Sequence, residues 1–220
     1  MVFRDRVDAG RQLAALLSAY RDQRPLVLGL PRGGVPVAAE VARALRGDLD
    51  VWVVRKLGCP IQPELGLGAL AEGGEIVIDE GRVARTGTTL EDLAQVARRE
   101  AAEVARRIRR YRGGQPAPEV RGRTVIVVDD GVATGGSVRA ALRALRKLAP
   151  ARLVLATPVA ASQTLRELAA EPDEIVCVEA SPHLHAIGAW YEDFRATPDE
   201  DVAELLRRAR ERSAGAAARP

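Results

Sequence analysis

The sequence has few of the residues that mark disulfide-rich, zinc-binding or nucleic-acid-binding proteins. Its two cysteines, Cys59 and Cys177, are spaced neither as a CxxC pair nor as a zinc site, so we expect no disulfide and no zinc. Aromatic residues make up only 3% of the chain, so the core must consist mainly of Val, Leu, Ile and Ala. The net charge of +3 is too small to indicate nucleic-acid binding by itself, and we expect no such partner.

Long apolar runs are also missing. No segment has the length and hydropathy of a membrane span, and the first ten residues, MVFRDRVDAG, lack the apolar centre of a signal peptide. We therefore expect a cytoplasmic protein with no membrane contact. The 220 residues suffice for one α/β domain with a substantial core and a small extra lobe. We place this domain at 1–210 and predict a disordered Ala/Gly-rich tail at 211–220.

Apolar runs and helical patterns alternate along most of the chain. Strands are predicted at 26–30, 51–54, 124–128, 152–157 and 175–178; helices are predicted at 8–20, 35–46, 90–112, 137–148, 162–170 and from about 197. Such alternation indicates a Rossmann-like parallel sheet flanked by helices. The loops after Leu30, Val54 and Val128 would then leave the carboxyl edge of the sheet, where ligands bind in such folds.

The most informative segment begins with the strand predicted at 124–128. The strand runs into Asp129 and Asp130, and a short Gly/Thr-rich loop and a helix follow. Backbone N–H groups of such a loop, together with the N-terminus of a helix, can bind a phosphate. Two carboxylates at the strand end can accept hydrogen bonds from hydroxyl groups. This combination suits a sugar phosphate with a free vicinal diol, although it also fits a strand, turn and helix in another α/β protein.

The run VIVVDDGVATGGS resembles the phosphoribosyl-diphosphate (PRPP) signature of the type I phosphoribosyltransferases. The resemblance implies that Asp129 and Asp130 hold the ribose 2′- and 3′-hydroxyls and contribute to catalysis, with a water-mediated contact to a metal as one option. It assigns the 5′-phosphate to the loop residues Ala133, Thr134, Gly135, Gly136 and Ser137. Two departures are Gly131, where the family usually has an apolar residue, and Ala133, where hypoxanthine-guanine enzymes carry an Asp proposed as general base. No general base can be assigned.

Two further segments offer positive charge at the expected edge. Arg32, Gly33 and Gly34 resemble the pyrophosphate-binding loop of the same family, although an ordinary tight turn would look similar. Arg55 and Lys56 resemble the Arg-Lys pair before the mobile catalytic loop of adenine phosphoribosyltransferases, and the resemblance gives them a catalytic role; the alternative is a solvated surface pair. The glycine-rich residues 57–87 are predicted to form a long loop that acts as a lid, with a small strand at 76–78. The alternative is a β-hairpin with no catalytic part, above all at 75–80.

The segment 179–197, with a contribution from the N-terminus, is predicted to form the small hood lobe. It resembles the hood of hypoxanthine-guanine enzymes, with His185 before Ile187 in the place of the aromatic residue that stacks on the base. His185 and Ile187 would then contact the base, and Glu192 or Asp193 would meet polar edges of the acceptor. The alternative is that the aromatic residues of this segment only pack the lobe.

The resemblance implies a transferase that moves 5-phosphoribose from PRPP to a nitrogenous acceptor, such as a nucleobase, and releases pyrophosphate. It also implies Mg²⁺ bound mostly through substrate oxygens. Two alternatives stay open: a non-catalytic PRPP- or nucleotide-sensing regulator that binds nucleic acid through the basic residues 106–112, and a phosphoribosyl hydrolase or phosphorylase-like enzyme. The acceptor and the oligomeric state, a homodimer included, are not determined by the sequence.

Overall fold

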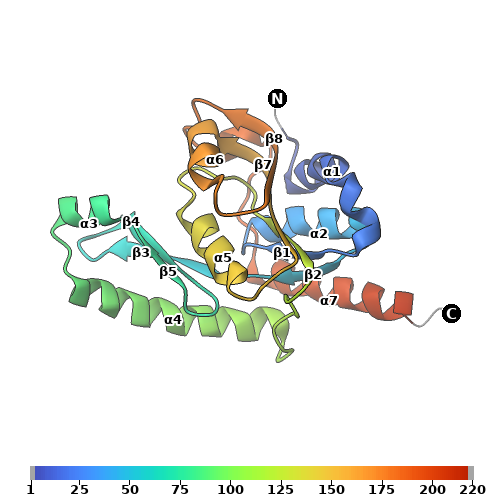
Figure 1. Cartoon of the computed structure of the whole chain (residues 1–220), viewed down its shortest axis with the longest axis horizontal. Helices are drawn as coiled ribbons and strands as arrows, with labels where there is room; N and C mark the ends of the chain where they lie inside the picture. The colour runs from blue at the N-terminus through green and yellow to red at the C-terminus, as the bar shows by residue number, and fades with distance from the viewer. Residues whose placement is uncertain (1–2, 218–220) are drawn as a thin grey trace.

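A computed structural model describes residues 3–217, and its core is a five-stranded parallel sheet of strand order β2-β1-β6-β7-β8 (Figure 1). The strands are β1 (Leu26–Gly29), β2 (Asp48–Val51), β6 (Thr124–Val128), β7 (Arg152–Ala161) and β8 (Glu174–Ser181). All four neighbouring pairs are parallel. The predicted Rossmann-like sheet is therefore confirmed.

Helices cover both faces of this sheet, which is why its strands are apolar runs rather than alternating patterns. Side chains alternate along a strand, so Ile126 packs in the core with α1 (Arg6–Leu16), α2 (Gly34–Leu45) and α7 (Asp199–Ala217). Val127 faces the other way and packs with α5 (Gly136–Arg146), and α6 (Ser162–Leu168) adds Leu168 to that side. A short 3₁₀ helix, η1 (Ser18–Gln23), follows α1.

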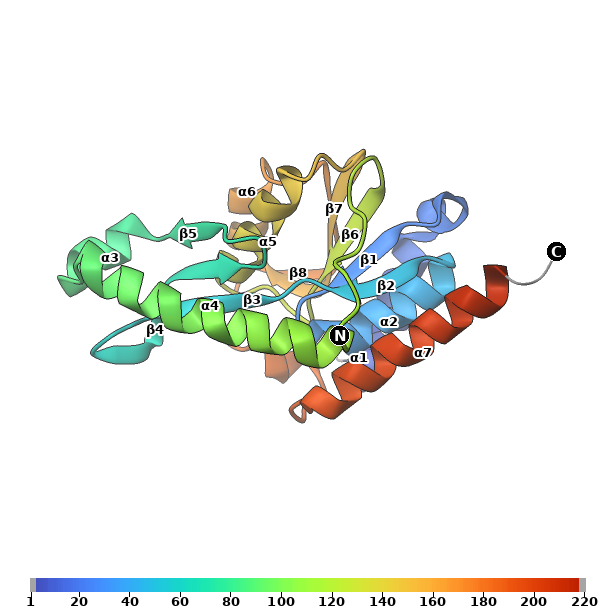
Figure 2. The same ribbon diagram turned by 90° about the horizontal axis from the view of Figure 1, so that it is seen from below.

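A second, antiparallel sheet extends to one side of the core (Figure 1). It consists of β3 (Val54–Cys59), β4 (Gln62–Ala71) and β5 (Ile76–Ile78), and is followed by α3 (Glu80–Thr86). We call these four elements the side lobe. The helix α4 (Leu90–Arg112) runs along the antiparallel sheet and reaches α7 at its far end (Figure 2).

The side lobe corrects two predictions. The strand predicted at 51–54 is two elements, because β2 ends at Val51 and β3 starts at Val54 in the other sheet. The long loop predicted at 57–87 is wrong, since most of it is strand or helix. The small strand at 76–78 and the alternative of a β-hairpin match the antiparallel pairing of β3, β4 and β5. The loop prediction failed because the glycines of this segment are typical of a loop. A Cβ on Gly68 would lie 2.3 Å from the carbonyl oxygen of Val77, so this glycine permits close strand pairing.

Arg112, the last residue of α4, joins the side lobe to the core. Its guanidinium is buried, and its Nε lies 3.1 Å from Asp50 Oδ1 on β2. Its Nη1 pairs with Glu72, the residue after β4, and its Nη2 donates to the carbonyl of Val51 at 2.9 Å. Buried charges need such partners, because an unpaired one is very costly.

The last helix is longer than predicted. α7 continues through Ala217, so residues 211–217 are helical rather than a disordered tail, and 218–220 lie outside the described residues. Near the other terminus, Phe3 forms a bridge with Tyr191, beside the short 3₁₀ helix η2 (Ile187–Trp190). The N-terminal segment thus packs against the residues for which a hood lobe was predicted. Among the described residues, no helix has the length and apolar character required to cross a membrane.

Candidate active site

The loops after β1 and β6 meet at the carboxyl edge of the parallel sheet. The N–H of Leu30 donates to the carbonyl of Val128 at 2.8 Å. A Cβ on Gly34 would lie 2.6 Å from that same carbonyl oxygen, and a Cβ on Gly33 would lie 1.9 Å from Asp130 Oδ2. Both glycines are therefore needed so that the two loops can approach each other. The peptide bond between Pro31 and Arg32 is cis.

Asp130 is held by a residue that the sequence did not point to. Its Oδ2 accepts a hydrogen bond from Arg6 Nε at 2.8 Å, and its backbone carbonyl accepts one from the Tyr191 hydroxyl at 2.6 Å. The guanidinium of Arg6 lies over the ring of Phe194, 4.0 Å from the ring centre. No local motif marks Arg6, which lies on the first helix and reaches this edge only through the fold.

The two carboxylates differ in their surroundings. Asp129 is half-buried, and its Oδ1 accepts the N–H of Asp130 at 2.9 Å. Burial, with the adjacent Asp130 charge as the next cause, raises the pKa of Asp129 well above its usual value. Burial also raises the pKa of Asp130, although the hydrogen bond and charge of Arg6 oppose the rise. A ligand that brings hydroxyl donors or a cation would therefore stabilise the ionised pair.

The loop between β6 and α5 borders a cavity of about 670 Å³. Thr134, Gly136 and Ser137 line it together with Lys56 of β3. Gly135 has φ +72°, a left-handed conformation that glycine adopts freely, and Thr164 Oγ1 donates to the Ala133 carbonyl at 2.5 Å. The structure therefore brings Lys56 and the predicted phosphate loop to one site.

Two arginines of this cavity were not predicted. Arg139 lies in the first turn of α5 and Arg82 lies on α3, and both line the cavity. Arg139 follows the phosphate loop directly, so its position in the sequence could have suggested it. Arg82 could not be found in that way, because the sequence interpretation treated its segment as a loop.

The side chains of Arg55 and Lys56 point to opposite faces of the antiparallel sheet. They lie inside β3 of the antiparallel sheet rather than after a parallel strand, so their side chains alternate. Arg55 Nε pairs with Glu100 on α4 at 2.7 Å. Lys56 Nζ donates to the carbonyl of Glu64 at 3.0 Å and faces the cavity. Arg32 lies on the surface, with its Nη1 3.8 Å from Asp199 Oδ1.

Of the four residues predicted to contact the acceptor, Ile187 lies against the loop after β6. A Cβ on Gly131 would lie 2.4 Å from Ile187 Cγ2, which explains why glycine stands here in place of an apolar residue. His185 and Glu192 are exposed. Asp193 pairs with Arg195, whose hydrogen bonds lower the pKa of that carboxyl to about 2.

Comparison with known proteins identifies the family. The family model of the phosphoribosyl transferase domain matches residues 4–190, and the chain belongs to this family. A protein of Mycobacterium tuberculosis strain H37Rv, provisionally named a phosphoribosyl transferase, is 42% identical over 208 residues, which cover 94% of this chain and 47% of that protein. The chain thus spans about half the length of the curated relatives it matches.

A solved structure extends this likeness to the fold. The crystal structure of TT1426 from Thermus thermophilus shares 44% identity with this chain and superposes with a TM-score of 0.78. The match covers 94% of this chain and 98% of that one. The side lobe and the parallel sheet therefore belong to an arrangement seen in a solved relative of nearly the same length.

Proposed function

We propose that this domain transfers 5-phosphoribose from PRPP to a nitrogenous acceptor, such as a nucleobase, and releases pyrophosphate. The observation that carries the proposal is the cavity of about 670 Å³ that is lined by Lys56 as well as by Thr134, Gly136 and Ser137. It supplies backbone N–H groups and a helix N-terminus for a phosphate, and a cation across from them. Family membership supports a transferase of this class.

In this reaction the C1–diphosphate bond of PRPP breaks, and positive charge develops on the ribose. The loop from Ala133 to Ser137 would hold the 5′-phosphate, while Asp129 and Asp130 would accept hydrogen bonds from the ribose hydroxyls. Arg32, with the N–H groups of Gly33 and Gly34, would bind the diphosphate. Lys56 would neutralise charge on the departing pyrophosphate. The domain would thus act by positioning and charge stabilisation rather than by covalent catalysis.

Mg²⁺ fits the donor set at the strand end. Each of the two carboxylates uses one oxygen in the hydrogen bonds given above, which leaves the other oxygen of Asp129 and of Asp130 for a ligand. Among residues 3–217, no group of three or more His, Cys, Asp or Glu side chains forms a metal cage. This suits an ion that keeps most of its ligands from substrate and water. When bound, Mg²⁺ would neutralise the diphosphate.

The acceptor would enter beside the hood. Ile187 lies against Gly131, next to Asp129 and Asp130, and His185 and Glu192 are exposed nearby in the sequence. We propose that Ile187 contacts the acceptor and that His185, Glu192 and Asp193 select among acceptors. For Tyr191 and Phe194, packing is the better interpretation, since their rings are 4.9 Å apart and Arg6 lies over Phe194.

The test is pyrophosphate release from Mg²⁺-PRPP in the presence of a panel of bases and small amines. Lys56→Ala should lower turnover about 10²- to 10³-fold, since it removes a cation from the developing charge. Asp129→Asn and Asp130→Asn should weaken PRPP binding. The matched control is Lys147→Ala, because Lys147 is the other lysine of the chain and pairs with Glu75 away from the cavity. Equal turnover in Lys56→Ala and Lys147→Ala would contradict the assignment.

The same assay separates the alternatives. Ribose 5-phosphate formed without any acceptor would indicate a hydrolase. A regulator that binds nucleic acid through residues 106–112 is disfavoured by the ion pairs of that segment: Arg106 and Arg107 pair with Glu103, and Arg110 pairs with Glu200. These arginines are largely neutralised by partners within the fold.

A further inference from the structure

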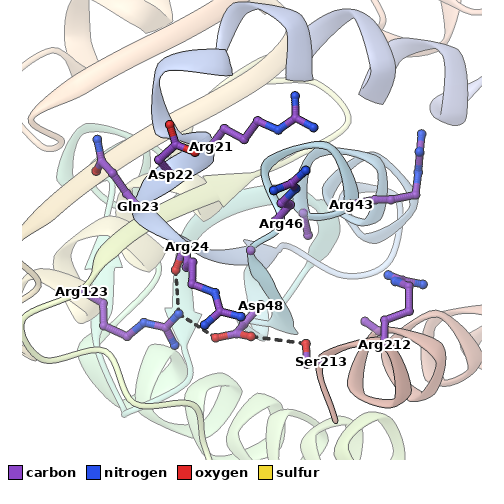
Figure 3. A pocket seen from close by; sticks show the side chains of 13 residues that line it. Arg21, Asp22, Gln23, Arg24, Arg43, Arg46, Asp48, Arg123, Arg212 and Ser213 are labelled. Carbon is purple, nitrogen blue, oxygen red and sulfur yellow. Dashed lines mark hydrogen bonds and ion pairs between the residues drawn. The ribbon is translucent and has the colours of Figure 1, made fainter. Parts of the chain in front are cut away.

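A second cavity lies at the opposite end of the parallel sheet, where β1, β2 and β6 begin. It has a volume of about 870 Å³ and is formed by η1, the end of α2, the residues before β6 and the last turns of α7 (Figure 3). Its lining contains six arginines: Arg21, Arg24, Arg43, Arg46, Arg123 and Arg212. We call this the arginine cavity.

Most of this positive charge has no partner in the fold. Arg43 pairs with Glu40 at 2.6 Å and Arg123 pairs with Asp48 at 2.7 Å. Within the part of the chain that the structure describes, the side chains of the other four arginines make neither a hydrogen bond nor an ion pair. Against six arginines the lining has two carboxylates, Asp22 and Asp48, so its formal charge is +4. Like charges that line one cavity repel one another, and an anion would relieve that repulsion.

The backbone at this cavity is unusual as well. The described chain has three residues other than glycine with positive φ, and two of them, Arg24 (φ 46°) and Arg46 (φ 55°), line the arginine cavity. Arg46 caps the C-terminus of α2 at a position where glycine is normally preferred. A left-handed backbone conformation is unfavourable for arginine, so another interaction has to offset its free-energy cost. Contact between the guanidinium and a bound ligand would be such an interaction.

We propose that the arginine cavity binds a compact polyphosphate group, such as a triphosphate, and recognises the phosphate chain rather than any base attached to it. Its volume lies in the range of small-molecule sites. A guanidinium group can donate two parallel hydrogen bonds to two oxygens of one phosphate, and it stays charged at all relevant pH values. No aromatic residue is among the 13 that line the cavity, so it offers no surface for base stacking.

The charge distribution favours a compact ligand over a nucleic-acid strand. In the adjoining hollow of about 350 Å³, Glu40 pairs with both Arg11 and Arg43. The hollow on the other side, of about 280 Å³, is lined by three carboxylates and two arginines. The first hollow shares Arg21 and Arg43 with the arginine cavity and adds only Arg11, which is paired, so neither hollow extends the unpaired arginines into the continuous basic track that a strand would need.

The site is separate from the candidate active site, yet the fold connects the two. α2 begins at Gly34, in the loop assigned to pyrophosphate, and ends beside Arg46. β1 begins after Arg24 and leads into the same loop. The residues of the arginine cavity and those of the cavity that contains Lys56 do not overlap. The proposal therefore does not depend on the reaction proposed above.

Isothermal titration calorimetry with sodium triphosphate, ATP and adenosine tests the proposal. The wild-type chain should bind triphosphate and ATP with similar affinity, more weakly as salt is raised, and should not bind adenosine. The Arg24→Gly/Arg46→Gly variant should lose about tenfold or more in triphosphate affinity, because two charged hydrogen-bond donors are removed. Its melting temperature should not fall, since glycine favours positive φ. The Lys56→Ala/Asp129→Asn variant should keep the binding.

Two matched controls show whether a loss of affinity comes from the missing guanidinium groups, rather than from a glycine placed at a position of positive φ or from a lower net charge. Ala149→Gly changes the third residue with positive φ (54°) and should leave the affinity unchanged. Arg166→Gln removes one surface charge on α6 and should also leave it unchanged. If Arg24→Gly/Arg46→Gly fails to fold, Arg21→Gln/Arg212→Gln takes its place with the same expectation.

The proposal is overturned if triphosphate binding is not saturable, if the arginine variant keeps its affinity, or if ATP binds and triphosphate does not. It is also overturned if a 20-nucleotide RNA displaces triphosphate and binds more tightly through the same arginines. The last result would make the cavity part of a nucleic-acid surface. Binding lost in Lys56→Ala/Asp129→Asn would place the triphosphate in the active-site cavity instead.

Discussion

The parallel sheet and the side lobe bury their residues in different ways. In β6, four of the five residues are buried, and they pack against helices on both faces. In β4 the first three residues, Gln62 to Glu64, are exposed, and in β5 only Val77 is buried. Apolar burial stabilises the parallel sheet, whereas the side lobe also relies on the buried ion pairs of Arg112.

Because of this difference, the two parts of the candidate active site, the loop after β6 and Lys56, lie on regions that we expect to differ in rigidity. The phosphate loop follows a strand in the middle of the parallel sheet, between β1 and β7. Lys56 lies on the side lobe, whose strands are partly exposed. Regions with less buried apolar surface open more readily. We therefore expect the lobe to move toward a bound ligand while the phosphate loop keeps its position, and three predictions examine this contrast.

The largest effect should come from the link between the two regions. Arg112→Met leaves Asp50 and Glu72 buried without a counter-charge, and should lower the free energy of unfolding by about 3–5 kcal/mol at neutral pH. Urea denaturation measures the change. The control is Arg106→Met on the same helix, where the exposed ion pair with Glu103 is worth about 1 kcal/mol or less. If the two variants lose similar stability, apolar contacts rather than this ion-pair cluster hold the lobe.

An intermediate effect should arise inside the side lobe. Gly68→Ala places a Cβ 2.3 Å from the Val77 carbonyl oxygen, so β4 and β5 must separate locally. We expect a loss of about 1–3 kcal/mol, as for other overpacked sites. Amide hydrogen exchange should accelerate in β5 and stay unchanged in β6. Gly81→Ala in α3 is the control, because its Cβ would have only ordinary contacts, and it should be neutral or slightly stabilising. Equal acceleration in β6 would argue against an independent lobe.

The smallest effect should be a change in the pH dependence of stability, caused by Asp129 at the carboxyl edge of the parallel sheet. Burial raises the pKa of Asp129, so the folded protein binds this proton more tightly than the unfolded chain does. Stability therefore falls as the pH rises from the ordinary carboxyl pKa toward the raised one. Asp129→Asn should remove this fall and raise stability slightly at pH 7, although we expect it to weaken the proposed PRPP binding.

Asp193→Asn provides a control of opposite sign for that measurement. Hydrogen bonds from Arg195 lower the pKa of Asp193 to about 2, so its ionised form favours the folded state above the ordinary carboxyl pKa, and this contribution is lost as the pH falls toward 2. Asn at 193 should therefore not stabilise the protein at pH 7. Thermal unfolding between pH 3 and pH 8 measures both variants. A similar rise in stability for both would mean that the Asp129 result does not reflect burial.

Part of this architecture could be predicted because its signals are local. The strand at 124–128, the helix at 90–112 and the glycine-rich loop between β6 and α5 lie where they were predicted. A continuous apolar run indicates a strand buried on both faces, and the Asp-Asp pair with the glycine-rich loop directly follows it. The side lobe was missed, since its glycines look like loop residues until their pairing partners are known.

By itself, the sequence determined the alternation of strands and helices, and with it the parallel sheet and the glycine-rich loop between β6 and α5, because the spacing of apolar residues and the placement of glycines act over a few neighbouring residues. Tertiary structure alone decided that Arg6 pairs with Asp130, 124 residues further along, and that Lys56 rather than Arg55 faces the phosphate loop. It also gathered six arginines from separate elements into one cavity. These outcomes depend on which elements pack together and on the register of each strand, and neither is encoded within a short segment.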